Sequence, residues 1–427
     1  KISLIVIITD YNAIKSTIYG VVMKFYIAKT HIFLALMVGL SSMAWANPAA
    51  TLTGFAKLDV ETYATGPISG RAAKTANGIV VPFKAQPVQG FSGALKNHDS
   101  SYTVLADNGY GTKDNSADFL LRIYHLDVDF RSKEGGGGEV KVLDFIQLRD
   151  PNKLIPFEIV NENSADRLLT GADFDPESIQ RTSDGSYWIG EEFGPFLLHF
   201  NKEGVLIDAP IALLHPNQKN QQLRSPQNPL NTNYSSPTTV QRSGGFEGMA
   251  LSSDGKFLYP MLEKPLTDTG TKQLLISEFD VQKKAYTGNH YWFVLDERAT
   301  AIGDFQMIDN RSGIVIERDD TENDWNGYKK LIRITLGRSG QAVDRTDLVD
   351  LMNIDNPDHL YGPVRAGDMG VGQRFTFPFF TIEDIIIEDD RTITVFNDNN
   401  FPGSSGRNAN LADDNEIIRL NLHQPLR

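Results

Sequence analysis

A phrase that returns along this chain constrains its fold more than any other feature. In two copies a glutamate, Glu177 or Glu247, lies seven residues before the Asp of an Asp-Gly turn, at Asp184-Gly185 and at Asp254-Gly255. Apolar segments flank each turn, and a second acidic residue follows the later segment. Each copy therefore predicts two antiparallel strands joined by a tight turn. Because paired strands lie about 4.8 Å apart, the two acids of a copy are expected at the same edge of a sheet.

The spacing of the copies predicts the architecture. Five copies begin near Phe91, Glu177, Glu247, Phe305 and Glu383, at steps of 58 to 86 residues. Four-stranded blades with insertions fit these steps, and such blades close radially into a β-propeller. We therefore predict an all-β fold, a β-propeller of six blades, with five to seven compatible with the length. A two-sheet sandwich is the alternative, but it does not require a returning motif. The final apolar segment, 414–422, is expected to complete a blade with residues near 52–60.

Composition limits the class of protein and its partners. The chain has 427 residues, 41% hydrophobic and 22% charged, as an ordinary soluble globular protein has, and it has no cysteine. The net charge is −13, and residues 1–46 carry four Lys and one Asp, so the remainder carries −16. Such an acidic body argues against nucleic acid or an anionic membrane as the main partner. We expect a monomer that acts on a small molecule.

The first 46 residues are predicted to lie outside the fold. From Met23 the chain has a positive start, an apolar run over 32–40 and a small-residue cleavage site at Ala44-Trp45-Ala46. This pattern predicts a secretory signal peptide over 23–46. Residues 1–22 are interpreted as a spurious upstream segment, and 47–427 as one mature domain without a membrane span. An uncleaved membrane anchor is the alternative, although the apolar run is short for one. The protein is expected in the periplasm or the medium.

Acidic side chains are expected to gather at one mouth of the propeller channel. If the strand nearest the axis comes first in each blade, the leading acids surround the axis and the acids ending the return strands lie beside them. Converging carboxylates either raise their pKa values or bind a cation, and hard oxygen ligands suit Ca²⁺. The alternative is that these acids accept backbone hydrogen bonds or stay solvated. The predicted Ca²⁺ ligands are Glu177, Glu192, Glu247, Glu263, Glu383 and Asp398, with Asp107 and Glu317 expected at the same mouth.

Other candidate residues follow from position and charge. We predict Glu191 as the general base, because a carboxylate without a metal bond can accept a proton. Lys113, Arg122 and Arg407 lie in or after polar, Gly-rich segments and are candidates to orient an anionic group, although solvated surface cations are the alternative. The fourth copy lacks the leading Glu; if every blade is needed to bind the metal, this copy would have to contribute Asp304 instead. No Gly-x-Ser-x-Gly elbow, HExxH or Walker A motif occurs in the sequence.

Four stretches together resemble a known family. They are 107–124, 174–200, 244–266 and 381–403. In this order they are similar to the bacterial phytase-like family, described as having esterase-like activity of phytase, over roughly 52–422. The resemblance implies an exported β-propeller hydrolase of esters or phosphate monoesters, and it carries over no catalytic residue set. With the acidic mouth, it predicts a Ca²⁺-dependent hydrolase. The alternatives are a Ca²⁺-dependent lactonase and a non-catalytic propeller that binds a glycan, peptide or envelope partner.

Overall fold

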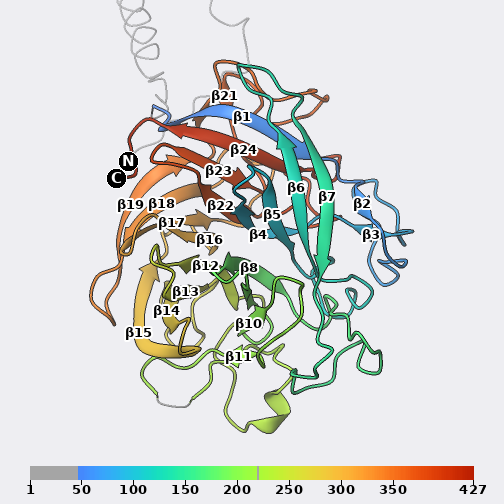
Figure 1. The fold of residues 1–427 in the computed structure, drawn as a ribbon. Helices are drawn as coiled ribbons and strands as arrows, with labels where there is room; N and C mark the ends of the chain where they lie inside the picture. Colours follow the sequence, from blue (N-terminus) through green and yellow to red (C-terminus); the bar gives the residue numbers. More distant parts are fainter. Residues whose placement is uncertain (1–46, 219–220) are drawn as a thin grey trace, which may run out of the picture. The chain divides into compact units, whose positions relative to one another are not determined.

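Strands make up almost all of the regular structure. The computed structural model describes residues 47–218 and 221–427, and one 3₁₀ turn, η1 (Asn231–Asn233), is the helical element of that part. The predicted signal peptide and upstream segment lie outside the described residues. Within them, no helix has the length and apolar character needed to cross a membrane. The prediction of an all-β fold is confirmed (Figure 1).

The strands form five groups of four, and four of these groups follow chain order from the inside outward, whereas the fifth takes its outer strand from the start of the described chain. The first group is β4 (Phe91–Lys96), β5 (Tyr102–Ala106), β6 (Arg122–Asp129) and β7 (Glu139–Gln147). The second is β8 (Pro176–Arg181), β9 (Tyr187–Glu191), β10 (Phe196–Phe200) and β11 (Ile211–Ala212). The third is β12 (Phe246–Leu251), β13 (Phe257–Leu262), β14 (Gln273–Asp280) and β15 (Ala285–Val294). The fourth is β16 (Ala301–Met307), β17 (Ser312–Arg318), β18 (Lys329–Thr335) and β19 (Asp344–Asp350). The fifth is β22 (Asp384–Ile387), β23 (Thr392–Phe396), β24 (Asn415–Leu422) and β1 (Ala50–Leu58). Short pairs join β2 (Tyr63–Ala64) to β3 (Gln86–Pro87) and β20 (Ile354–Asp355) to β21 (Arg374–Phe375).

The first strands of the groups form a closed ring. β4 contacts β8, β8 contacts β12, β12 contacts β16, β16 contacts β22, and β22 contacts β4. Among the described residues the propeller therefore has five blades, one for each copy of the repeated phrase and one fewer than the six expected. The chain length predicted too many blades, because long connections such as 148–175 and 351–383 add residues without adding a blade.

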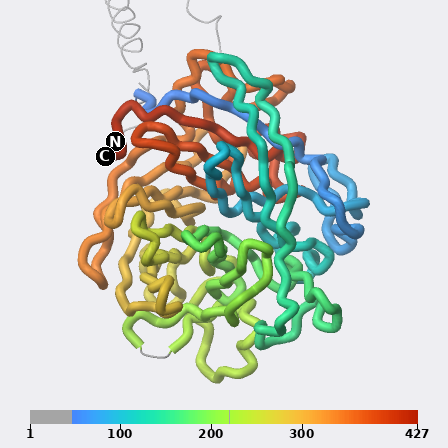
Figure 2. The backbone as a smooth tube through the Cα atoms, viewed as in Figure 1, coloured from blue at the N-terminus to red at the C-terminus, as the bar shows by residue number. Residues whose placement is uncertain are grey.

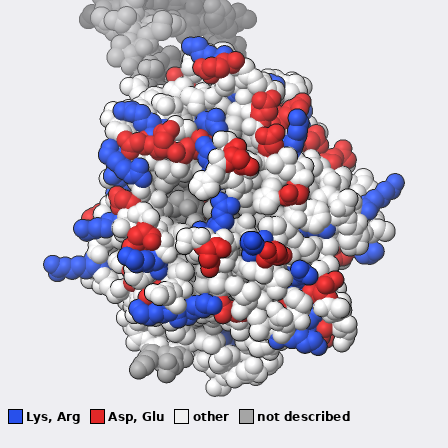
Figure 3. All heavy atoms as spheres, in the orientation of Figure 1, with Lys and Arg blue, Asp and Glu red and all other residues white. Residues whose placement is uncertain are grey.

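The two ends of the described chain close the ring in one blade. β1 pairs antiparallel with β24, from Ala50 opposite Leu422 to Leu58 opposite Asn415. Figure 2 shows these first and last strands side by side. Apolar residues of both strands are buried in the core of this blade, including Leu52, and the prediction that the chain ends complete one blade is confirmed. On the face seen in Figure 3, acidic and basic side chains are interspersed, so that view shows no large patch of one sign.

Candidate functional site

The site begins where two inner strands depart from regular pairing. The register between β8 and β9 shifts at Glu177, and the register between β12 and β13 shifts at Glu247. A β-bulge of this kind re-aims the side chain at the extra position. Both glutamates line one cavity, so the first acid of each repeated phrase is directed to a common space.

This acidic cavity has a volume of about 280 Å³ and a large excess of negative groups. All six predicted Ca²⁺ ligands line it. Its carboxylates belong to Asp107, Asp175, Glu177, Glu192, Glu247, Glu263, Glu383 and Asp398. Two cationic side chains of the described residues, Lys264 and Arg318, line it as well. Eight carboxylates facing two cations cannot all be ionised at low cost, so the cavity requires protons or a further cation.

Three of the carboxylates are close enough to share one ion. Glu192, Glu247 and Glu263 each offer an oxygen atom, and these atoms lie within 4.8 Å of one another. All three residues are buried. Hard carboxylate oxygens in this arrangement fit Ca²⁺, which takes oxygen ligands at about 2.3–2.6 Å.

The third carboxylate of this trio is already paired. Glu263 lies 2.8 Å from Arg318 Nη2 and 2.8 Å from Lys264 Nζ. Arg318 Nη2 is also 3.8 Å from Glu247. The two protein cations therefore neutralise mainly the Glu263 side of the trio, and Glu192 forms no ion pair among the described residues.

Burial and mutual repulsion govern the protonation of the cavity. Burial, and then the negative charge of neighbouring acids, raises the pKa of Glu177, Glu192 and Glu247 well above the ordinary value. Burial raises the pKa of Asp175 and of Asp398 to about 6, against the hydrogen bonds they accept. Without a bound cation, part of the cavity is thus protonated near neutral pH.

Hydrogen bonds hold the other acids of the cavity in place. Ser92 Oγ of β4 donates to Glu383 at 2.6 Å, which links the first and fifth blades. Asn108 Nδ2 donates to Asp175 at 2.7 Å. The backbone N–H of Asn400 donates to Asp398 at 2.7 Å. These bonds fix the carboxylates around the trio without filling the space between them.

Arg318 takes the place of an acid in the fourth blade. It follows Glu317 at the end of β17, and adjacent strand residues point to opposite faces. Glu317 turns away from the cavity and accepts hydrogen bonds from Tyr328 Oη at 2.7 Å and Arg345 Nη2 at 2.6 Å. The expectation that Glu317 lies at this mouth is therefore wrong. Arg318 faces the cavity instead, and its buried Nε has no acceptor among the described residues.

The fourth copy also differs in its inner strand. Asp304 accepts hydrogen bonds from the N–H of Phe305 at 2.6 Å and of Ile385 at 2.8 Å, so its carboxylate ties β16 to β22. Asp304 is absent from the lining of the acidic cavity, so the fourth blade does not contribute this acid there. A Cβ atom at Gly303 would lie 1.9 Å from the carbonyl oxygen of Ile382. This close approach of β16 to the segment just before β22 leaves no room for an acidic side chain at Gly303.

Replacement of Gly303 by Ala is expected to lower the free energy of unfolding by about 1–3 kcal/mol, because the added methyl group overpacks the contact between blades. Urea unfolding would measure the change. Gly337 is a matched control, since a Cβ atom there meets no atom within 4 Å. Equal stability of Gly303→Ala and Gly337→Ala would contradict the close approach.

The predicted general base, Glu191, is placed differently from its neighbour Glu192. Its carboxylate accepts backbone N–H bonds from Phe193 at 3.0 Å, Gly194 at 2.7 Å and Phe196 at 2.8 Å. Burial raises its pKa to about 8. Glu191 is absent from the cavity lining and instead shapes the turn after β9.

Two of the three predicted substrate cations are held by other groups. Lys113 Nζ donates to the carbonyl of Gln227 at 2.9 Å. Arg122 Nε donates to Gln147 Oε1 at 3.0 Å, and its guanidinium stacks on Phe145 at 3.9 Å. Neither cation lines the acidic cavity.

The third predicted cation, Arg407, is a buried structural brace. Its Nε and Nη2 atoms bind Glu416 of β24 at 2.9 and 2.8 Å. Nη2 also donates to the carbonyl of Thr376 at 3.0 Å, and Nη1 to that of Met369. A guanidinium enclosed in this way cannot meet a substrate. Sequence reasoning missed Asp175, Lys264 and Arg318 as cavity residues, although Asp175 stands two positions before Glu177 in the same phrase.

Comparison with known proteins gives one extended match and several weak ones. The family described as Phytase-like, "Esterase-like activity of phytase", matches residues 86–401. An uncharacterized secreted protein of Arthroderma benhamiae is 27% identical over 135 residues, which cover 28% of this chain and 26% of that protein. The matched region therefore spans about a quarter of that relative's length.

Solved structures resemble the chain only distantly. An arabinanase of Bacillus subtilis is 12% identical with a TM-score of 0.36, over 78% of this chain and 96% of that chain. A virginiamycin B lyase of Staphylococcus aureus is 13% identical with a TM-score of 0.31, over 78% and 95%. These likenesses carry no argument about function. The family match, in contrast, spans 316 of 427 residues and includes both glutamates at the shifted registers. The chain therefore belongs to the Phytase-like family.

Proposed function

We propose that this protein is an exported, Ca²⁺-dependent hydrolase of carboxylic esters or phosphate monoesters. The observation that carries the proposal is the convergence of Glu192, Glu247 and Glu263 in a cavity whose acids outnumber its cations. Membership of the Phytase-like family supports ester hydrolysis. The secreted relative and the signal-peptide pattern support export.

The trio would hold the ion, with the remaining acids of the cavity around it. Calcium bound there would polarise the ester oxygen and lower the pKa of a water molecule. Glu192 and Glu247 would supply carboxylate oxygens to the ion, because Arg318 and Lys264 hold neither of them as closely as they hold Glu263. Glu263 would stay oriented by Arg318 and Lys264.

We place the general base on Glu177. Its side chain lines the cavity and is partly exposed, whereas Glu191 is fully engaged by backbone N–H groups. Burial and the charges of Asp175 and Glu247 raise the pKa of Glu177, which favours proton transfer near neutral pH. Glu177 would take a proton from water as the water oxygen bonds to the carbonyl carbon or phosphorus. The ester bond to the alcohol oxygen then breaks, and Glu177 returns the proton to that oxygen.

Arg318 is the candidate donor for the negative charge that develops on the substrate. Its buried Nε has no acceptor among the described residues, although the same guanidinium binds Glu263 through Nη2. An unpaired donor in a small cavity is positioned for an oxyanion or phosphoryl oxygen. This proposal gives Arg318 the role that the sequence analysis gave to Lys113, Arg122 and Arg407.

Removal of calcium provides the test of the proposed function. The purified protein is assayed with 1-naphthyl acetate, 1-naphthyl phosphate and a γ-lactone, before and after EGTA treatment. We expect chelation to lower hydrolysis about 100-fold or more, and added Ca²⁺ to restore it. Activity that survives chelation would refute the metal-dependent mechanism. A protein that binds Ca²⁺ but hydrolyses none of the three compounds would instead be a binding propeller.

A further inference from the structure

A second cavity of about 540 Å³ borders the acidic one. The two share Asp107, Gly111 and Asn400 as lining residues. A molecule whose reacting bond lies among the carboxylates therefore has room to extend past these three residues. We call this second cavity the side groove.

The walls of the side groove are mainly apolar and are held rigidly. They include Ala72, Ala73, Ala76, Tyr110, Phe401 and Pro402. The ring of Phe83 packs behind them, 6.1 Å from the Tyr110 ring and 5.2 Å from the Phe401 ring. Tyr110 and Phe401 are themselves buried, so these aromatic walls are already formed before a ligand arrives.

The polar groups of the side groove are largely bonded to the protein. The hydroxyl of Tyr110 pairs with Ser69 Oγ at 2.8 Å. Asn115 Nδ2 donates to the carbonyl of Tyr110 at 2.7 Å, and its Oδ1 accepts from Thr112 Oγ1 at 2.8 Å. The side-chain amide of Asn400 donates to Thr381 Oγ1. Few polar partners remain for a strongly hydrated ligand.

The charges of the side groove also select against a polyanion. Its lining contains one cationic side chain, Lys74, and two acidic ones, Asp107 and Asp114. Recognition of several phosphate groups requires clustered Arg or Lys side chains. A neutral apolar group, in contrast, gains by leaving water for these walls.

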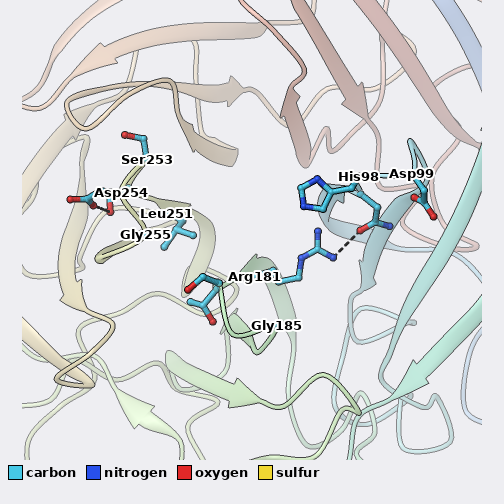
Figure 4. Close-up of a pocket in the computed structure, with 12 residues that line it drawn as sticks. His98, Asp99, Arg181, Gly185, Leu251, Ser253, Asp254 and Gly255 are labelled. Carbon is cyan, nitrogen blue, oxygen red and sulfur yellow. Dashed lines mark hydrogen bonds between the residues drawn. The ribbon is translucent and has the colours of Figure 1, made fainter.

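A cavity larger than the side groove lies elsewhere in the described structure. Its volume is about 790 Å³, and it lies among the turns that join β4 to β5, β8 to β9 and β12 to β13, at the other end of the inner strands (Figure 4). Arg181 donates a hydrogen bond to Asn97 there at 2.8 Å. It shares no lining residue with the acidic cavity, so it does not extend that site.

We propose that the side groove binds a flat apolar group, such as an aromatic ring, of the ester that the acidic cavity cleaves. The inference rests on the proposed function and narrows its substrate class. The preferred substrates are esters with one aromatic or similarly apolar substituent, and a ring that carries several phosphates is excluded from the groove.

The first experiment compares two esters on groove variants. Ala73→Gln places a polar amide in the apolar wall, and Ala285→Gln is the matched control on the outer strand β15. We expect Ala73→Gln to raise KM for 1-naphthyl acetate about tenfold and to leave KM for ethyl acetate within twofold. Ala72 is exposed, so Ala72→Gln repeats the test at a position that cannot disturb the core. Unchanged KM values in both groove variants would overturn the proposal.

The second experiment separates the groove from the chemistry. Binding of 1-naphthol, followed by its fluorescence, requires no turnover. If the protein hydrolyses no ester, but 1-naphthol binds and Ala73→Gln weakens this binding about tenfold, the groove proposal is supported and the proposed function is refuted. If esters are hydrolysed but neither groove variant changes 1-naphthol binding, the groove proposal is refuted and the proposed function is supported. Displacement of 1-naphthol by inositol hexakisphosphate at a lower concentration than by 2-naphthol would also overturn the groove proposal.

Discussion

Replacement of Glu247 by Gln is expected to stabilise the calcium-free protein and to abolish its stabilisation by calcium. Burial, then the charges of Glu263 and Glu383, raises the pKa of Glu247, so its ionised form is unfavourable in the folded state. The amide removes this charge, and we expect a gain of about 1–2 kcal/mol in EGTA. It also removes one of the three ligands, so hydrolysis should fall about 100-fold or more. Thermal unfolding with EGTA and with 1 mM Ca²⁺ measures both effects.

The matched control makes the same chemical change at a buried glutamate outside the cavity. Glu317 is buried, as Glu247 is, but Tyr328 and Arg345 bind its carboxylate. Glu317→Gln should therefore destabilise the protein by about 1–3 kcal/mol and leave its calcium response intact. If both variants lose stability equally in EGTA, Glu247 is not held in an unfavourable charge state. The case for a cation in the acidic cavity would then fail.

The repeat made much of the fold predictable. Each copy of the phrase marks one inner strand and its partner, because alternation of apolar residues and a tight turn are local properties. The ring closure could be predicted from the apolar segments near 52–60 and 414–422. The blade number was less certain, because a count from length cannot separate blades from connections. The copies themselves, at five, were the better guide.

The convergence of acids was predictable, but their individual orientations were not. Leading acids in equivalent positions must meet when strands surround an axis, as Glu177 and Glu383 do. Whether Glu191 or Glu192 faces inward depends on a register shift of one residue, which flips every side chain. In the same way, Arg318 faces the cavity and its neighbour Glu317 does not. The periodicity of the apolar residues does not determine which of two neighbouring side chains faces the cavity, because the bulge lies at the end of the strand.

The predicted substrate cations show a different limit. Arg407 stands in a polar, Gly-rich segment that is typical of an exposed loop, and nothing local indicates its burial. Its partner Glu416 belongs to β24, whose position depends on closure of the ring. A cation that is bonded by distant segments becomes structural, whereas Arg318, at the end of a repeated strand, reaches the cavity. Position in the repeat was thus a better guide to the site than local polarity.

The calcium-free protein is expected to lose stability as the pH rises from about 4 to 7. Burial raises the pKa of Asp175 and of Asp398 from 3.8 to about 6 in the folded state. Acids whose pKa is raised by folding contribute full stability below their unfolded pKa, and this contribution is lost as the pH rises through the folded value. A difference between 3.8 and about 6 corresponds to about 3 kcal/mol for one such group, and because the charge of Asp175 acts on Asp398 the two contributions do not add in full. Carboxylates whose pKa is lowered by folding change stability in the opposite sense, at lower pH. In Glu388, burial alone would raise the pKa, but the hydrogen bonds from Lys96 and Thr394 lower it.

Calcium should reverse this trend, because it competes with protons for the same carboxylates. At pH 7.5, 1 mM Ca²⁺ is expected to raise Tm by several degrees, and at pH 5 to change it little, because the acidic cavity is then largely protonated. Melting curves at both pH values, with and without EGTA, test the coupling, and Mg²⁺ serves as a control for ionic strength. A calcium-free protein that is more stable at pH 7.5 than at pH 5 would show that protein cations alone neutralise the cavity. Arg318 and Lys264 would then be its counter-ions, and no metal would be needed to hold the five inner strands together around it.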